Sequence, residues 1–125
     1  MSVAKGMNAA KLAKFSPFNA LKSTNLADLL DDIDVLHAIK GEALFNQGDA
    51  DSRTVYLLAG KVELRDGDQV AGTIVGGSDE ASNPLAPLTP RRLSAVALDD
   101  VQYFTIDSEL LDVKLTLDQT GIYEV

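Results

Sequence analysis

The sequence contains no cysteine, no tryptophan and a single histidine. Without cysteine the chain has no disulfide, no thiolate metal site and no cysteine nucleophile, and it suits a reducing compartment, so we expect a cytoplasmic protein. His37 stands in a strand-like run with no partners that we can place for catalysis or metal binding. We therefore interpret it as a packed or hydrogen-bonded side chain and predict no metal site.

Long apolar runs are absent too. No stretch approaches the ~20 apolar residues that cross a membrane, and the N-terminus lacks an apolar segment followed by a small-residue cleavage site. The chain also has no Gly-x-Ser-x-Gly elbow and no phosphate loop that ends in Gly-Lys-Ser/Thr. These absences predict a protein that is not an enzyme and that has no membrane partner.

Acidic residues are missing from the first 22 positions, which carry four lysines. The remainder holds all 19 acids, so the formal net charge of −8 divides into +4 for this start and −12 for the rest. A body this acidic repels phosphate backbones, and we expect no nucleic-acid partner. The simplest interpretation of residues 1–14 is a basic N-terminal arm or helix with solvated lysines.

The hydrophobic pattern of the 125 residues predicts one domain with helices at both ends. Ser23 or Thr24 can cap a helix over residues 25–31, where leucines recur on one face. From residue 33 the period changes to two, and short strand-like runs follow at 33–39, 43–46, 54–58, 61–65, 69–71, 73–75, 93–98 and 102–106. A last helix starts near Asp107 or Ser108. This order predicts a mainly β fold, an antiparallel jelly roll (double-stranded β-helix) with flanking N- and C-terminal helices.

Glycines punctuate the strand-like runs. The Asp66-Gly67 pair between two such runs predicts a β-hairpin, with the positive φ of a type I′ turn at the glycine. Asp49 can cap its own turn through its side chain. The predicted structural turn positions are Gly41, Gly48, Gly60 and Gly67.

The segment Lys40-Gly41-Glu42-Ala43-Leu44-Phe45-Asn46-Gln47-Gly48-Asp49 resembles the cyclic nucleotide-binding domain family, which has Gly-Glu, two apolar residues and Gln-Gly-Asp at this spacing. The resemblance continues at Asp51 and over 55–64, resumes at 90–97 and covers roughly residues 15–115. It implies a cyclic nucleotide-binding-like domain over 15–115. Residues 116–125 resemble a connection to a further domain in larger bacterial proteins, some of which continue into a rhodanese domain.

The resemblance also implies a phosphate-binding cassette in the proline-rich stretch 76–90. In the family the cassette opens with Gly-Glu-Leu-Ala, whose amides bind the cyclic phosphate while the Glu accepts a hydrogen bond from the ribose. Alignment of Leu85-Ala86 with Leu-Ala puts Asn83 at the Gly position and Pro84 at the Glu position. Proline has neither a carboxylate nor an N–H, so this cassette departs from the family pattern.

The closing end of the cassette has two alignments. In one, Arg92 is the phosphate arginine, Ser94 the small residue and Ala95 stands in place of the usual hydroxyl. In the other, Arg91 takes the arginine role and Ser94 supplies the hydroxyl. If both arginines lie in the strand, they face opposite sides and cannot both face the pocket, and we favour Arg92. The plainer alternative is that both arginines are surface charges paired with nearby acids.

Two functions follow from these patterns. The first is a sensory or regulatory module, with no cofactor, that binds a cyclic nucleotide or another small anion weakly if at all. If an anion site persists, we expect it at Arg92 and residues 77–83 rather than on the lysine arm, because backbone amides of a Gly/Ser-rich loop can converge on an oxyanion. The alternative is a degenerate roll that serves as a protein-interaction or structural domain, with a second copy or another protein as partner.

Overall fold

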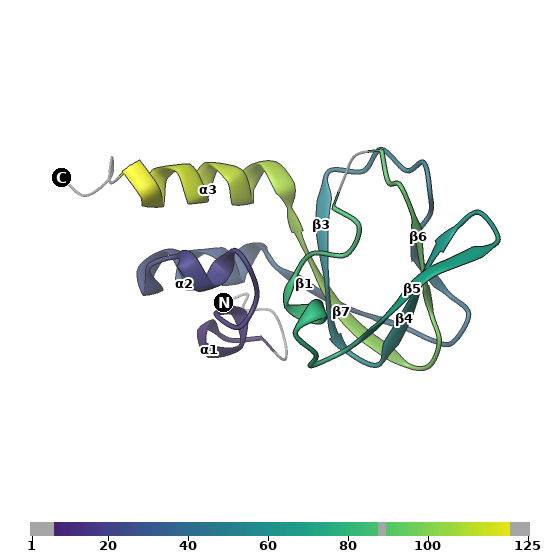
Figure 1. Cartoon of the computed structure of the whole chain (residues 1–125). Coiled ribbons are helices and arrows are strands. Elements are labelled where there is room, and N and C mark those ends of the chain that lie inside the picture. The colour runs from purple at the N-terminus through teal and green to yellow at the C-terminus, as the bar shows by residue number, and fades with distance from the viewer. Residues whose placement is uncertain (1–6, 88–89, 121–125) are drawn as a thin grey trace.

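The computed structural model describes residues 7–87 and 90–120, in which seven strands form two antiparallel sheets (Figure 1). One sheet has the order β1-β7-β3, and the other has the order β2-β6-β4-β5. The strands are β1 (Asp34–Ala38), β2 (Ala43–Phe45), β3 (Arg53–Ala59), β4 (Lys61–Asp66), β5 (Gln69–Val75), β6 (Ser94–Ala97) and β7 (Val101–Asp107). The predicted antiparallel roll is confirmed. The two short runs predicted at 69–71 and 73–75 are one continuous strand, β5.

The N- and C-terminal helices lie together on one side of the roll (Figure 1). They are α1 (Ala9–Leu12), the 3₁₀ helix η1 (Phe18–Ala20), α2 (Ser23–Leu29), the 3₁₀ helix η2 (Leu30–Asp32) and α3 (Ser108–Thr120). No helix in the described ranges is long and apolar enough to cross a membrane.

The ends of two helices show what local pattern can and cannot predict. Helix α3 begins where expected, because the N–H of Leu110 donates to Oδ1 of Asp107 at 3.0 Å. Helix α2 begins two residues earlier than predicted and has no cap from its own side chains. Instead, Oδ1 of Asp118 in α3 accepts hydrogen bonds from the Lys22 N–H at 3.2 Å and from the side-chain amide of Asn25. The C-terminal helix therefore caps the N-terminal one.

Strands β3 and β7 of the first sheet are buried on both faces in their middle, and they separate two apolar clusters. Along β3, Val55 and Leu57 belong to the cluster inside the roll, whereas Tyr56 belongs to the cluster beneath the helices. The Tyr56 ring stacks on Phe104 with centroids 4.7 Å apart, and its hydroxyl donates to the Ser16 carbonyl at 2.8 Å. Burial raises the pKa of Tyr56, so the hydroxyl stays protonated and available as a donor.

The N-terminal segment is anchored on this second cluster. Phe15 makes edge-to-face contacts with Tyr56 and Phe104, and Phe18 is fully buried beside them. Leu12, which lies within the stretch predicted as a basic arm, is also fully buried. From Met7 onward, therefore, the lysine-bearing start packs on the domain and presents its lysines outward.

The β4–β5 hairpin confirms the prediction at Asp66-Gly67 and corrects its turn type. Asp66 pairs with Gln69, so the two loop residues are Gly67 and Asp68. Gly67 has φ +60°, and Asp68 is not among the residues with positive φ. That pattern is a type II′ turn, which needs positive φ at its first loop residue only, rather than type I′. Asp49 also caps its turn as predicted, since its Oδ2 accepts the Asn46 N–H at 2.9 Å.

We expect Gly67→Val to lower the free energy of unfolding by about 1–3 kcal/mol, because a β-branched residue is strained at positive φ. A Cβ built on Gly67 meets no atom within 4 Å, so the loss reports backbone strain rather than a clash. Chemical denaturation followed by circular dichroism measures it. Gly67→Asn is the control, because asparagine tolerates this conformation and should lose less. Identical midpoints for parent and valine variant would contradict the assigned turn.

Candidate functional site

The loop between β5 and β6 folds back against the roll and contributes to its core. It contains the 3₁₀ helix η3 (Glu80–Ser82), in which Ala81 is buried, and it continues to the buried Leu85. The N–H of Leu85 donates to the Val55 carbonyl at 2.8 Å. Ala81 and Leu85 thus pack with the side chains of the roll interior. The described part of the loop is an ordered wall of the roll, fixed by apolar burial and by a bond to β3.

Arg91, at the end of this loop, points into the protein. Its side chain is only 1% exposed, and its guanidinium carbon lies 4.2 Å above the centre of the Phe45 ring. The backbone explains the direction, because the Arg91 N–H donates to the Asp49 carbonyl and its carbonyl accepts the Gly48 N–H, both at 2.8 Å. The turn after β2 therefore sets which face the Arg91 side chain takes.

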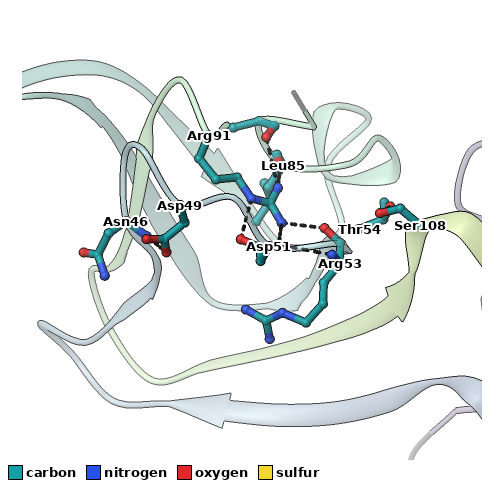
Figure 2. Close-up of polar contacts among 9 residues, drawn as sticks. Asn46, Asp49, Asp51, Arg53, Thr54, Leu85, Arg91 and Ser108 are labelled. Atoms are coloured by element: carbon teal, nitrogen blue, oxygen red, sulfur yellow. Dashed lines mark hydrogen bonds and ion pairs between the residues drawn. The ribbon is translucent and has the colours of Figure 1, made fainter. Parts of the chain in front are cut away.

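Every N–H of the Arg91 guanidinium is hydrogen-bonded within the protein (Figure 2). Nε donates to Oδ2 of Asp51 at 3.1 Å, and Nη2 donates to Oδ1 of the same carboxylate at 2.6 Å and to the Arg53 carbonyl. Nη1 donates to the carbonyls of Leu85 at 3.3 Å and Ala86 at 3.0 Å. A guanidinium has five N–H donors, so none is left for a ligand.

The charge of Arg91 is neutralised where it lies. The hydrogen bond from Arg91 is the largest effect on Asp51 and lowers the pKa of that carboxyl below its ordinary value, while burial partly opposes it. Asp51 is therefore ionised at neutral pH. The loop adds carbonyl oxygens to this pair rather than amides, and Ala86 takes a left-handed backbone, φ +37°, beside it. An anion entering here would meet a paired cation and a ring of acceptors.

No protein-family model and no curated protein matches the sequence. Solved structures do match. The sensor domain of the transcriptional regulator DNR from Pseudomonas aeruginosa superposes with a TM-score of 0.72 at 21% identity, over 87% of this chain and 80% of that one. A protein of Geobacter metallireducens described as cyclic nucleotide-binding gives 0.72 at 19%, over 91% and 86%. The cAMP-bound regulatory domain of Toxoplasma gondii PKA gives 0.68 at 9%, over 93% and 47%.

The chain has the cyclic nucleotide-binding fold. At sequence identities of 9–21%, the structural superposition establishes that this chain has the β-roll fold and shows nothing about its ligand. The chain spans most of the DNR sensor domain and of the Geobacter protein, but about half of DNR as a whole and about half of the kinase regulatory chain. The family resemblance found in the sequence is thus confirmed at the level of the fold.

Within this roll, the prediction that Arg92 is the inward-facing arginine is wrong. Arg92 is exposed and makes no hydrogen bond or ion pair in the described structure, whereas Arg91 is buried. Neither arginine lies in β6, which begins at Ser94, so strand alternation does not decide between them. The backbone hydrogen bonds of Arg91 to Gly48 and Asp49 set its direction instead. Nor is Arg91 a surface charge, as the plainer alternative had it.

The other candidate cassette residues lie in different surroundings. Asn83 is exposed, and Ala95 is fully buried in β6. The Ser94 hydroxyl oxygen accepts the Gln47 N–H at 2.8 Å and so serves the β2 turn. Leu85 and Ala86 do converge with Arg91, through their carbonyls. His37 is exposed on β1, and no group of three His, Cys, Asp or Glu side chains in the described residues could hold a metal ion.

Sequence reasoning missed the role of Asp51, the residue that decides the chemistry of this site. Asp51 and Arg91 are 40 positions apart, on different loops, and no periodic pattern links them. The one available signal was that Asp51 falls within the segment that resembles the family. A resemblance of that kind marks a position without stating what it contacts.

Proposed function

We propose that this chain is a non-catalytic regulatory module of the cyclic nucleotide-binding type whose roll binds cyclic nucleotides weakly if at all. The observation that carries the proposal is the complete internal use of the Arg91 donors. The arginine serves as a lock that holds the 76–90 loop, through the carbonyls of Leu85 and Ala86, to the start of β3.

A cyclic phosphate would have to break this lock to bind. Displacing Asp51 would leave a half-buried carboxylate without its partner, and displacing the loop carbonyls would leave buried acceptors without donors. Each such loss costs about 1–3 kcal/mol. The sugar offers little in return, because Pro84 stands where a ribose-binding carboxylate would be. A missing hydrogen bond to a charged group alone weakens binding roughly ten- to hundredfold.

We expect isothermal titration with cyclic AMP, cyclic GMP and cyclic di-GMP to give dissociation constants well above about 1 μM. Pro84→Glu tests which cause dominates. It restores the carboxylate but leaves Arg91 paired, so its affinity should stay low. A submicromolar constant for the parent would overturn the proposal. A gain of tenfold or more in Pro84→Glu would show that the arginine is free to bind phosphate.

The alternative function, a degenerate roll that binds protein, gains support from β5. This seven-residue edge strand pairs only with β4 in the described structure, carries no charged side chain, and exposes Val70 and Val75 by 59% and 43%. Unpaired, uncharged edge strands accept a further strand, and a second copy of this chain would offer one. Concentration-dependent sedimentation that Val70→Lys abolishes would favour this function.

A further inference from the structure

A pocket of about 430 Å³ opens outside the roll, where the N-terminal segment meets the 76–90 loop. Lys14 and Phe15 line it from the N-terminal side, and Gly77, Ser78 and Ser82 line it from the loop. The two segments are joined directly, since the Ser16 N–H donates to the Ser82 carbonyl at 2.7 Å. None of the side chains around Arg91 lines this pocket, so it is separate from the interior of the roll.

The pocket walls combine cationic and amide donors with an apolar surface. Lys11 and Lys14 both line the pocket, and the Lys14 ammonium has no hydrogen bond or ion pair among the described residues. The side-chain amide of Gln102, half-buried at the pocket wall, likewise has no partner there. Phe15 and Leu58 supply the apolar part of the lining.

The electrostatic setting favours an anion at this position. The chain beyond residue 22 carries a formal charge of −12, yet Lys14 lines this pocket, and Asp79 is the one carboxylate among the described residues that line it. The Gly77 N–H has no hydrogen-bond partner in the described part of the chain, and Gly77 has φ +85°. The backbone that carries the two lysines of the pocket is held in place, because Leu12 and Phe15 beside them pack on the core. In this respect they differ from lysines on a solvated arm.

We propose that this pocket binds a small organic anion, a carboxylate or phosphate monoester with a planar or apolar body. Lys14 and the Gln102 amide bind the charged group, and Phe15 and Leu58 contact the body. From the sequence alone, the lysine arm and residues 77–83 are alternative anion sites. In this pocket both contribute, since the lysine segment supplies the charge and the 77–82 segment supplies the wall. Arg92, expected at any anion site, does not line it. The proposal does not rest on the state of the roll interior.

A ligand here would act on the domain through the loop. It would contact both the N-terminal segment and η3, a few residues before the Leu85 and Ala86 carbonyls that hold Arg91. Binding would therefore stabilise the packing of the N-terminal segment on the roll, and the unfolding temperature should rise with ligand concentration.

The test is an NMR titration of the ¹⁵N-labelled full chain with adenosine 5′-monophosphate, benzoate and inorganic phosphate. We expect saturable shifts of the Gly77 and Ser78 amides and of the Gln102 side-chain amide with an organic anion, and weaker binding of inorganic phosphate. Lys14→Gln should weaken the organic anion about tenfold, the loss typical of one charge-assisted hydrogen bond. Lys40→Gln, the same change at an exposed site outside the pocket, should leave the affinity unchanged.

Three results would overturn the proposal. The first is no saturable shift with either organic anion up to about 10 mM, a range that covers even weak metabolite sites. The second is equal affinity of the Lys14 and Lys40 variants for the organic anion. The third is a set of shifts confined to Ala86, Arg91 and Ala95. The last would place the ligand in the roll and count against the proposed function as well. If no shift appears either at the pocket or in the roll interior, the pocket proposal fails and the proposed function stands. The two proposals can therefore be contradicted separately.

Discussion

Replacing Arg91 with alanine is expected to lower the free energy of unfolding by about 3–5 kcal/mol, the usual cost of breaking a buried ion pair by removing one partner. The change leaves the Asp51 carboxylate with the Arg53 N–H in place of its charged partner, and it removes the donors of the Arg53, Leu85 and Ala86 carbonyls. Urea denaturation followed by far-ultraviolet circular dichroism is the suitable measurement, since the chain has no tryptophan.

The adjacent residue provides the control. Arg92→Ala removes the same side chain one position later, where it is exposed and unpaired in the described structure, and should change stability by no more than about 0.5 kcal/mol. Comparable losses at the two positions would contradict the lock. If Arg91→Ala does not fold, Arg91→Lys keeps the charge but lacks the planar fork, and its loss should be measurable and smaller.

The pH dependence gives a second check of the same pair. Arg91 lowers the folded-state pKa of Asp51 below its ordinary value of 3.8, so the unfolded state binds the proton more readily. The pairing therefore stabilises the fold fully above that ordinary value and ceases to do so as the pH falls through the folded-state pKa. The stability difference between parent and Arg91→Ala should be constant near neutral pH and shrink in acid. A difference that grows in acid would contradict the assignment.

Gly60→Ala is expected to lower the free energy of unfolding by about 2–5 kcal/mol, because a left-handed backbone and a steric overlap add together. Gly60 links β3 to β4 with φ +91°, and a Cβ there would lie 2.4 Å from the Asp100 carbonyl oxygen. That oxygen belongs to the backbone between β6 and β7, so the overlap is relieved only by moving a strand connection. The same denaturation experiment measures the loss.

Gly41 separates the two contributions. Its φ of +92° matches that of Gly60, but a Cβ built on it meets nothing within 4 Å. Gly41→Ala should therefore lose only the backbone strain, about 1–2 kcal/mol. A Gly60 variant no less stable than the Gly41 variant would show that the β6–β7 connection yields to the added methyl group.

Much of the fold was determined by local sequence. Three features were visible in the sequence, because each depends on neighbours within a few positions. They are the change from helical to alternating periodicity near residue 33, the Asp66-Gly67 hairpin and the start of α3 directly after its cap residue, Asp107. The order of these elements with the family resemblance was enough to predict an antiparallel roll with flanking helices.

What the sequence alone left open is whatever depends on a partner distant along the chain. Whether Arg91 or Arg92 enters the roll is decided by the backbone bonds to Gly48 and Asp49, more than 40 positions away. The cap of α2 comes from Asp118 at the other end of the chain, and the outer pocket brings Lys14 beside the 77–82 segment. The partner of a charged side chain or of a helix end is the group that packing places next to it, and packing is a property of the folded chain. The tertiary structure therefore decided that the Arg91 guanidinium is hydrogen-bonded within the roll, to Asp51 and to backbone carbonyls.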